Sequence, residues 1–379
     1  MSTTEFSPPP GALASSSSSS GQTLRVRICS RTDVGRERGH NEDNYLVADL
    51  GTKARIGEKS VQSIEVGERG LLLAVCDGMG GAAAGEVASQ MAVDTLYEEM
   101  LRPENAPSRE ELARGLMRAV EEAGGKIFAE AAAKREMRGM GTTVTAAVFR
   151  DENVFFAQVG DSRAYLVRGG VVTQVTRDQS LVNKLIEAGQ LTEEEAESYE
   201  HTNIILQALG TSDRVEVDLT HADLRQGDML MLCSDGLSGM LKKDGLEAVL
   251  LSGTDPEVLC EKLIDGANAA GGSDNITVIV MVVEGAEDSK TAATEEPVRY
   301  KKFSLPPAAS AGPVLSIAPA PTVITGESSG ETLVITPTYS TPKVEEAVVL
   351  PKTEAPSMKP VVIGAAIVVL GLVGWLLSK

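Results

Sequence analysis

The fold is decided by residues 71–89, which read Leu-Leu-Leu-Ala-Val-Cys-Asp-Gly-Met-Gly-Gly-Ala-Ala-Ala-Gly-Glu-Val-Ala-Ser. Leu71 to Cys76 form an apolar run of strand length that stops at Asp77, and three of the next four residues are glycine. Because glycine has no side chain, this segment can turn tightly and leave its carbonyls accessible. Beyond Gly85, apolar residues recur every three or four positions, as on one face of a helix. We therefore expect a strand, an acidic turn and a helix, with a carboxylate at the edge of a sheet.

The composition of the whole chain narrows the possible functions. A chain of 379 residues with a net charge of -19 can bury a large core, and its charge would repel nucleic acid. The four cysteines are widely spaced, which favours a reducing compartment over a disulfide framework. With three histidines, a thiolate or imidazole metal site is largely excluded. Cation binding or a basic protein partner is compatible with the charge.

Composition also divides the chain into four parts. Residues 1–21 are rich in proline and serine and are expected to be disordered, and they lack the features of a secretory signal. Residues 22–285 are expected to form one globular domain. Residues 286–359 shift to Pro, Ala, Thr and Ser, which is typical of a linker. Residues 360–378 include 17 uncharged apolar residues, Val361 to Leu377, and predict a transmembrane helix. A C-terminal helix packed on the domain is the alternative.

Within residues 22–285, strand patterns outnumber helix patterns and occur in runs. This arrangement predicts an α+β domain with antiparallel sheets. Arg168-Gly169-Gly170 predicts a hairpin turn between two strands. The expected helices cover residues 85–101, 109–136, 180–189, 193–198 and 255–270, and the expected strands cover residues 24–29, 45–48, 71–76, 143–149, 154–159, 164–167, 171–175, 229–233 and 276–283.

Acidic turns border five of the expected strands. Asp77, Asp161 and Asp235 end apolar runs, whereas Asp43 and Asp274 begin them. In an antiparallel sheet the end of one strand lies beside the start of its neighbour, so all five carboxylates can gather at one edge.

A cleft with five carboxylates requires cations, because mutual repulsion would otherwise force some of them to protonate. Oxygen ligands favour Mg²⁺ or Mn²⁺ over zinc. Two such ions roughly 3.5 to 4 Å apart would acidify a shared water for in-line attack at phosphorus. The sequence therefore predicts a two-metal phosphoester hydrolase.

Six motifs follow one another along residues 25–283. They are Arg38-Gly39-His40-Asn41-Glu42-Asp43, Asp77-Gly78-Met79-Gly80-Gly81 with Gly85-Glu86, Gly141-Thr142-Thr143, Gly160-Asp161-Ser162-Arg163-Ala164, Ser234-Asp235-Gly236-Leu237 and Gly272-Ser273-Asp274-Asn275-Ile276-Thr277. In this order they resemble the motifs of the metal-dependent serine/threonine protein phosphatases of type 2C, in their bacterial form.

This resemblance implies a four-layer αββα sandwich, with two antiparallel sheets between helices, that hydrolyses phosphoserine and phosphothreonine without a phosphoenzyme. It implies roles for eight residues around two Mn²⁺ or Mg²⁺ ions and a possible third. Asp77 would bridge the two ions, and the Gly78 carbonyl, Asp235 and Asp274 would complete the coordination of one of them. Glu42 and Asp43 would bind the ions directly or through water. Asp161 would join Asp235 at the third ion, and Arg38 would bind the substrate phosphate.

Several positions depart from the family pattern. Met79 stands where animal members have a histidine, and Ala82 where bacterial members usually have one. Protonation of the leaving group then falls to a metal-bound water unless His40 reaches the site. Residues 179–210 resemble the mobile flap of the family, with Gln179 and His201 where His and Arg are commoner. Substrate preference is therefore the property that transfers least.

The sequence leads to an enzyme held at the cell membrane with its catalytic domain in the cytoplasm. Its expected partners are phosphorylated proteins, including membrane-associated serine/threonine kinases and their substrates. A silent module that only binds phosphoproteins, and a regulatory phosphatase of an anti-sigma-factor pathway, are the alternatives. The complete acidic set argues against a silent module.

Overall fold

A computed structural model describes residues 24–57, 61–80, 84–102, 108–196, 199, 204–284 and 298–305. Its helices and strands lie between Arg25 and Glu284, inside the predicted domain 22–285. The predicted tail 1–21, most of the predicted linker 286–359 and the predicted transmembrane helix 360–378 lie outside the described residues. Within the described ranges, no helix combines the length and apolar character that crossing a bilayer requires.

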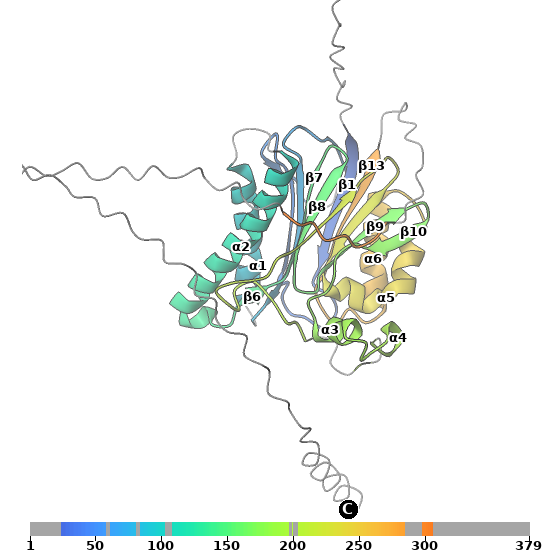
Figure 1. Ribbon diagram of the computed structural model, residues 1–379. Coiled ribbons are helices and arrows are strands. Elements are labelled where there is room, and N and C mark those ends of the chain that lie inside the picture. The colour runs from blue at the N-terminus through green and yellow to red at the C-terminus, as the bar shows by residue number, and fades with distance from the viewer. Residues whose placement is uncertain are drawn as a thin grey trace, which may run out of the picture. The chain divides into compact units, whose positions relative to one another are not determined.

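The described strands form two antiparallel sheets, which confirms the predicted class (Figure 1). One sheet has the order β10-β9-β12-β13-β1-β4, and the other has the order β11-β8-β7-β5-β2-β3 with β6 paired to β5. The strands are β1 Arg25–Asp33, β2 Asp43–Asp49, β3 Ala54–Arg55, β4 Gln62–Glu65, β5 Leu71–Met79, β6 Gly141–Thr142, β7 Val144–Arg150, β8 Asn153–Val159, β9 Arg163–Arg168, β10 Val171–Gln174, β11 Asp218–Asp223, β12 Met229–Cys233 and β13 Ile276–Glu284.

Helices cover the outer faces of the two sheets, α1 and α2 on one side and α5 and α6 on the other (Figure 1). The helices are α1 Ala84–Leu101, α2 Arg109–Ala133, α3 Leu181–Glu187, α4 Glu193–Ala196, α5 Asp235–Leu250 and α6 Pro256–Ala269, with a 3-10 turn at Arg135–Met137. Ser108 forms a capping box with Glu111 at the start of α2. Asp255 caps α6 by accepting from Glu257 and Val258.

The core has three layers because apolar side chains of buried strands point alternately to the two faces. On β5, Leu72, Ala74 and Cys76 pack toward α1 and α2. The alternate residues of β5, Leu71 and Leu73 among them, pack between the two sheets. A third apolar cluster fills the space between β13 and the helices α5 and α6. The four cysteines are buried and form no disulfide.

The hairpin predicted at Arg168-Gly169-Gly170 joins β9 to β10, and both glycines have positive φ. Helix α5 and the strands β3, β4, β6 and β11 were not predicted. Strand β11 reads Asp-Leu-Thr-His-Ala-Asp and has only two apolar residues, Leu219 and Ala222, so its apolar signal is weak. Helix α5 was missed because Asp235 was interpreted as a turn residue. Its helical pattern is interrupted by three glycines and by a kink at Lys242, where φ is 46°.

Residues 298–305 belong to the predicted linker, yet they lie along β11. The Phe303 N–H donates to the Leu219 carbonyl at 2.7 Å, and Thr220 pairs with Lys302 in antiparallel register. Phe303 and Leu305 pack against the apolar layer beneath α1 and α2. The prediction of a linker is therefore wrong for this segment, which is packed on the domain. The surrounding composition, rich in Pro, Ala, Thr and Ser, gave no sign of this packing.

Candidate functional site

Strand pairing brings the first two predicted carboxylates together. In the register of β2 and β5, Asp43 lies opposite Asp77. Asp77 does not end its strand as predicted, because β5 continues to Met79 and pairs with β6. The Asp77 N–H donates to Thr143 Oγ1 at 3.0 Å, and the Asp77 carbonyl accepts from the Thr143 N–H at 2.9 Å. The Asp77 backbone is thus fixed from both sides, and the turn begins only at Gly80, where φ is +128°.

Gly78 is required by close packing. Its N–H donates to the Glu42 carbonyl at 3.1 Å, and a Cβ at this position would lie 2.6 Å from the same oxygen. It would also overlap the carbonyl of Gly85 at the start of α1. Only glycine allows β5, the Glu42 segment and α1 to meet here, so the motif glycines assemble the site.

Asp235 and Asp274 come from the other sheet. Asp235 is the first residue of α5, where the helix dipole favours a carboxylate, and its N-cap residue is Ser234. The buried Ser234 hydroxyl donates to Asp43 Oδ2 at 2.7 Å, which joins the two sheets at this edge. Asp274 lies two residues before the start of β13.

Asn275 holds the loop that carries Arg38. Its side-chain amide donates to the carbonyls of Val34 and His40, both at 2.9 Å, while its Oδ1 accepts from the Glu42 N–H at 2.8 Å. This role was not assigned from the sequence, although Asn275 belongs to the last motif. Three hydrogen bonds from one buried amide fix a long loop against β13.

These residues line a cleft of about 410 Å³. Arg38, exposed over 53% of its side chain, donates to Asp274 Oδ2 at 2.7 Å. His40 also reaches the cleft, as does Ile205 from the flap segment. The residues that line the cleft are Arg38, Gly39, His40, Glu42, Asp77, Gly78, Met79, Gly80, Ile205, Asp235, Asp274 and Asn275.

Asp43 and Asp161 lie beside the cleft and are not among its lining residues. Both are buried, with 5% and 7% of their surface exposed. They still belong to one electrostatic group, because Asp43 interacts with Asp235 and Asp274, and Asp161 with Asp235. Six of the eight predicted residues therefore line the cleft, and the other two lie beside it.

Burial and mutual repulsion raise the pKa of these carboxyls. Burial raises the pKa of Asp43 to about 8. Hydrogen bonds from Thr277 and Ser234 oppose this shift, and the neighbouring carboxylates of Asp235 and Asp274 add to it. Burial and the charge of Asp235 raise the pKa of Asp161 to about 7. Burial and, next, the charge of Asp43 hold the pKa of Asp77 well above its ordinary range. Burial also raises the pKa of Asp235.

Three of these carboxyls have a buried oxygen without a hydrogen-bond partner, namely Oδ1 of Asp43, Asp161 and Asp235. Among the described residues, no three Asp, Glu, His or Cys side chains already converge as a finished metal site. Carboxylates repel one another, so a convergent cage is not expected before a cation neutralises them. Buried oxygens that lack donors, all from hard ligands, fit divalent metal ions.

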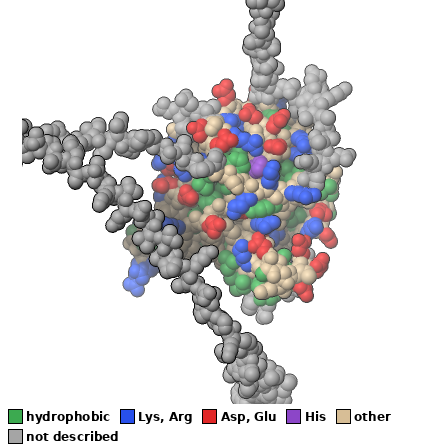
Figure 2. All heavy atoms as spheres, in the orientation of Figure 1, with side chains coloured by type: hydrophobic (Ala, Val, Ile, Leu, Met, Phe, Trp, Pro, Cys, Tyr) green, Lys and Arg blue, Asp and Glu red, His purple; other side chains and the backbone are tan. Residues whose placement is uncertain are grey.

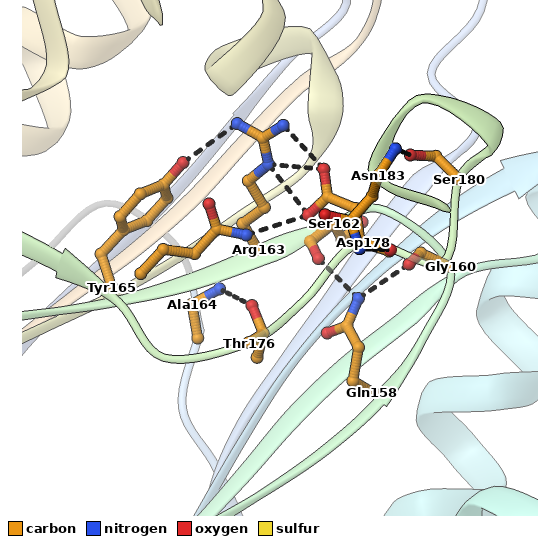
Figure 3. Close-up of polar contacts among 11 residues, drawn as sticks. Gln158, Gly160, Ser162, Arg163, Ala164, Tyr165, Thr176, Asp178, Ser180 and Asn183 are labelled. Atoms are coloured by element: carbon orange, nitrogen blue, oxygen red, sulfur yellow. Dashed lines mark hydrogen bonds and ion pairs between the residues drawn. The ribbon is translucent and has the colours of Figure 1, made fainter. Parts of the chain in front are cut away.

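The loop that presents Asp161 is held by the polar network in Figure 3. Arg163 forms a bidentate ion pair with Asp178, in which Nη2 donates to Oδ2 at 2.7 Å and Nε donates to Oδ1 at 3.1 Å. Gln158 donates to the carbonyls of Gly160 and Ser162 (Figure 3). The Ser162 hydroxyl bonds to Thr143 Oγ1 at 2.8 Å, and Thr143 in turn holds Asp77. The network connects the Asp161 loop to the backbone of Asp77.

The flap segment begins at this network. The Gly160 N–H donates to Gln179 Oε1, and Ser180 caps α3 through the Asn183 N–H. Ser180 pairs with Ile205, and the Ile205 side chain lines the cleft. His201, the other flap position that departs from the family pattern, lies outside the described residues.

Comparison with known proteins identifies the family. A profile described as protein phosphatase 2C matches residues 60–262. The serine/threonine phosphatase Stp of Listeria innocua is 38% identical over 251 residues, which is 66% of this chain and 93% of the relative. The chain belongs to the protein phosphatase 2C family. Membership confirms the prediction of an enzyme of the serine/threonine phosphatase class.

Solved structures agree with the fold. The Mycobacterium tuberculosis phosphatase PstP/Ppp superposes with a TM-score of 0.59 at 34% identity, covering 69% of this chain and all of that one. The PstP catalytic domain in complex with two manganese ions gives a TM-score of 0.57, again at 34% identity, with the same coverage. Sheets and helices of a 2C phosphatase therefore surround the acidic cleft described above.

Proposed function

We propose that the cleft hydrolyses phosphoserine and phosphothreonine in proteins with the help of two Mn²⁺ or Mg²⁺ ions. The observation that carries this proposal is the set of buried carboxylate oxygens without donors on Asp43, Asp161 and Asp235. The manganese bound to PstP, whose catalytic domain has the same fold, supports the choice of metal. When bound, such ions acidify a shared water and offset charge on the phosphoryl group.

The roles of the residues follow from their positions. Asp77, Asp235 and Asp274, with the Gly78 carbonyl, would hold the two ions at the cleft, and Glu42 would bind from the side of β2. Asp43 would hold Ser234 and contribute charge from behind, and Asp161 with Asp235 would hold a third ion. Arg38 would exchange Asp274 for the substrate phosphate, which its planar guanidinium can bind in bidentate fashion.

Hydrolysis of a phosphothreonine peptide tests this function. The purified protein should release phosphate with Mn²⁺, and a chelator should abolish the release. An Asp235→Asn variant should lose turnover, while a module that only docks onto phosphoproteins would retain its partner. Metal-independent release, or none with manganese present, would reject the assignment.

We further propose that residues 360–378 anchor the enzyme in the cell membrane, where it would oppose serine/threonine kinases. The support is the run of 17 uncharged apolar residues from Val361 to Leu377. Deleting residues 306–379, which spares the packed segment 298–305, should leave activity on a soluble peptide unchanged. The same deletion should slow dephosphorylation of membrane-bound substrates, since tethering raises the local concentration. Equal loss on both substrates would contradict the tether.

A further inference from the structure

Residues 298–305, which we call the strap, cover the edge of a sheet. Strand β11 is the last strand at one end of its sheet, and such an edge leaves backbone groups open. The strap fills this position, since the His221 N–H donates to the Lys301 carbonyl at 3.1 Å and Phe303 bonds to Leu219. Figure 1 shows the strap as the orange segment that crosses the front of the domain. The strap thus continues the sheet beyond β11.

An aromatic cluster fixes the strap in this position. The Phe303 ring meets Phe155 edge-on with centroids 4.9 Å apart, and it meets His221 at 5.1 Å. Edge-to-face contacts of this kind add to the free energy of apolar burial. Phe303 is therefore the main anchor of the strap on the domain.

Tyr300 connects the strap to a second element. Its hydroxyl donates to Asp218 Oδ2 at 2.6 Å, and the Arg177 guanidinium lies 4.1 Å from the centre of its ring. Arg177 also reaches Glu187, the last residue of α3, at 3.4 Å. Arg177 therefore contacts both the strap, through Tyr300, and α3, through Glu187. Figure 2 shows acidic and basic side chains interspersed over this face of the molecule.

The opposite end of α3 lies at the cleft. The Leu181 N–H donates to the Ile204 carbonyl at 2.9 Å, and Ser180 pairs with Ile205. Ile205 lines the cleft together with the carboxylates of the proposed metal site. A contiguous set of contacts therefore extends from the strap through Arg177 and α3 to the wall of the cleft.

We propose that Tyr300 is a positioning residue that holds α3 through Arg177, so that the strap helps to shape the wall where a phosphopeptide binds. This proposal rests on the proposed function. It adds a residue outside the predicted domain 22–285 to the determinants of substrate binding. Cation–π contacts at partly exposed sites predict an effect of about two- to tenfold on peptide binding.

Steady-state kinetics of the full chain with a Tyr300→Ala substitution test the proposal. KM for a phosphothreonine peptide should rise about two- to tenfold, while kcat/KM for p-nitrophenyl phosphate and the affinity for Mn²⁺ stay unchanged. Amide hydrogen exchange in residues 181–187 should become faster. Lys302→Ala is the matched control. Lys302 lies on the same strap and also pairs with Asp218, but Arg177 contacts the ring of Tyr300 and not Lys302. It should leave all three measurements unchanged.

Arg177→Ala provides a second route, since this side chain is 53% exposed and its removal does not disturb the core. It should reproduce the Tyr300→Ala effect, and the double variant should add nothing further. Additive effects, unchanged exchange in α3, or an equal loss on the small substrate would overturn the proposal. An unmodified protein that fails on both substrates would instead reject the proposed function.

Discussion

The two ends of strand β12 carry aspartates with opposite surroundings. Asp228 precedes the strand, is 2% exposed, and accepts two bonds from Arg168 at 2.9 and 2.6 Å. Asp235 follows the strand and has a buried oxygen without a donor. Asp178, beside the neighbouring strand β9, resembles Asp228 because Arg163 holds it in the same bidentate way.

This difference separates carboxylates that stabilise the fold from those that we propose bind metal. Where a buried carboxylate stabilises the fold, the protein supplies its own cation, as Arg163 and Arg168 do. Where the carboxylate has a partly unsatisfied oxygen and a raised pKa, the cation is expected from outside. The comparison predicts that substitutions at the two ends of β12 affect different properties.

The largest effect is expected at the cleft end. Asp235→Asn should reduce Mn²⁺-dependent kcat on a phosphopeptide by about 10² to 10³, because the proposed metal ligand and its charge are lost. The metal-free variant should unfold at the same or a higher temperature, since repulsion with Asp274 is relieved. Kinetics and thermal unfolding in chelator measure the two outcomes. A variant with normal turnover and reduced stability would place Asp235 with Asp228 instead.

The other end of the strand should give the reverse result. Asp228→Ala leaves Arg168 without its partner and should lower the free energy of unfolding by about 3 kcal/mol. Activity per folded molecule should remain normal, because Asp228 is distant from the cleft along β12. Denaturant unfolding and kinetics at a temperature where the variant is folded provide the test. A selective loss of kcat would break the comparison.

A smaller effect is expected from Arg38, the arginine that lines the cleft. Arg38→Lys keeps the charge but loses the planar fork, so kcat/KM for a phosphopeptide should fall about tenfold. Arg27→Lys is the matched control and should change nothing, because Arg27 pairs with Glu284 and does not line the cleft. Equal kinetics for Arg38→Lys and the unmodified protein would remove Arg38 from phosphate binding.

The smallest effect concerns the pH dependence of stability without metal. In the folded protein the pKa of Asp43 is about 8 and that of Asp161 is about 7, whereas the pKa of an aspartate in the unfolded chain is about 4. Between these values the folded state binds more protons than the unfolded state, so its stability falls as the pH rises.

Thermal unfolding in chelator at increasing pH measures this dependence. The slope should be shallower in an Asp161→Asn variant, by about 2 to 4 °C over the range from about pH 5 to 8. Manganese should reverse the trend, because the ions replace the bound protons. Identical slopes in the two proteins would show that the Asp161 carboxyl is not held in its neutral form.

Much of the site could be predicted from sequence because its residues border strong strand signals. Asp43 and Asp77 flank apolar runs that pair directly, so antiparallel geometry alone places them together. The same reasoning could not find Asn275, whose role depends on hydrogen bonds to a loop more than 230 residues away in sequence.

The strap was missed for a different physical reason. Its binding depends on the unpaired edge of β11 and on the aromatic contact of Phe303 with Phe155, and neither is visible as local periodicity. Helix α5 was missed because its glycines weaken the helical pattern while tertiary packing on β13 maintains it. Local propensity is overridden by packing in both places.

Anomalous diffraction from crystals grown with manganese tests the central claim most directly. The account predicts two peaks about 3.5 to 4 Å apart beside Asp77 and Asp235, a third ion only beside Asp161, and no peak beside Asp178 or Asp228. A cleft without peaks in saturating manganese, with the oxygens of Asp235 bonded to protein donors, would contradict it.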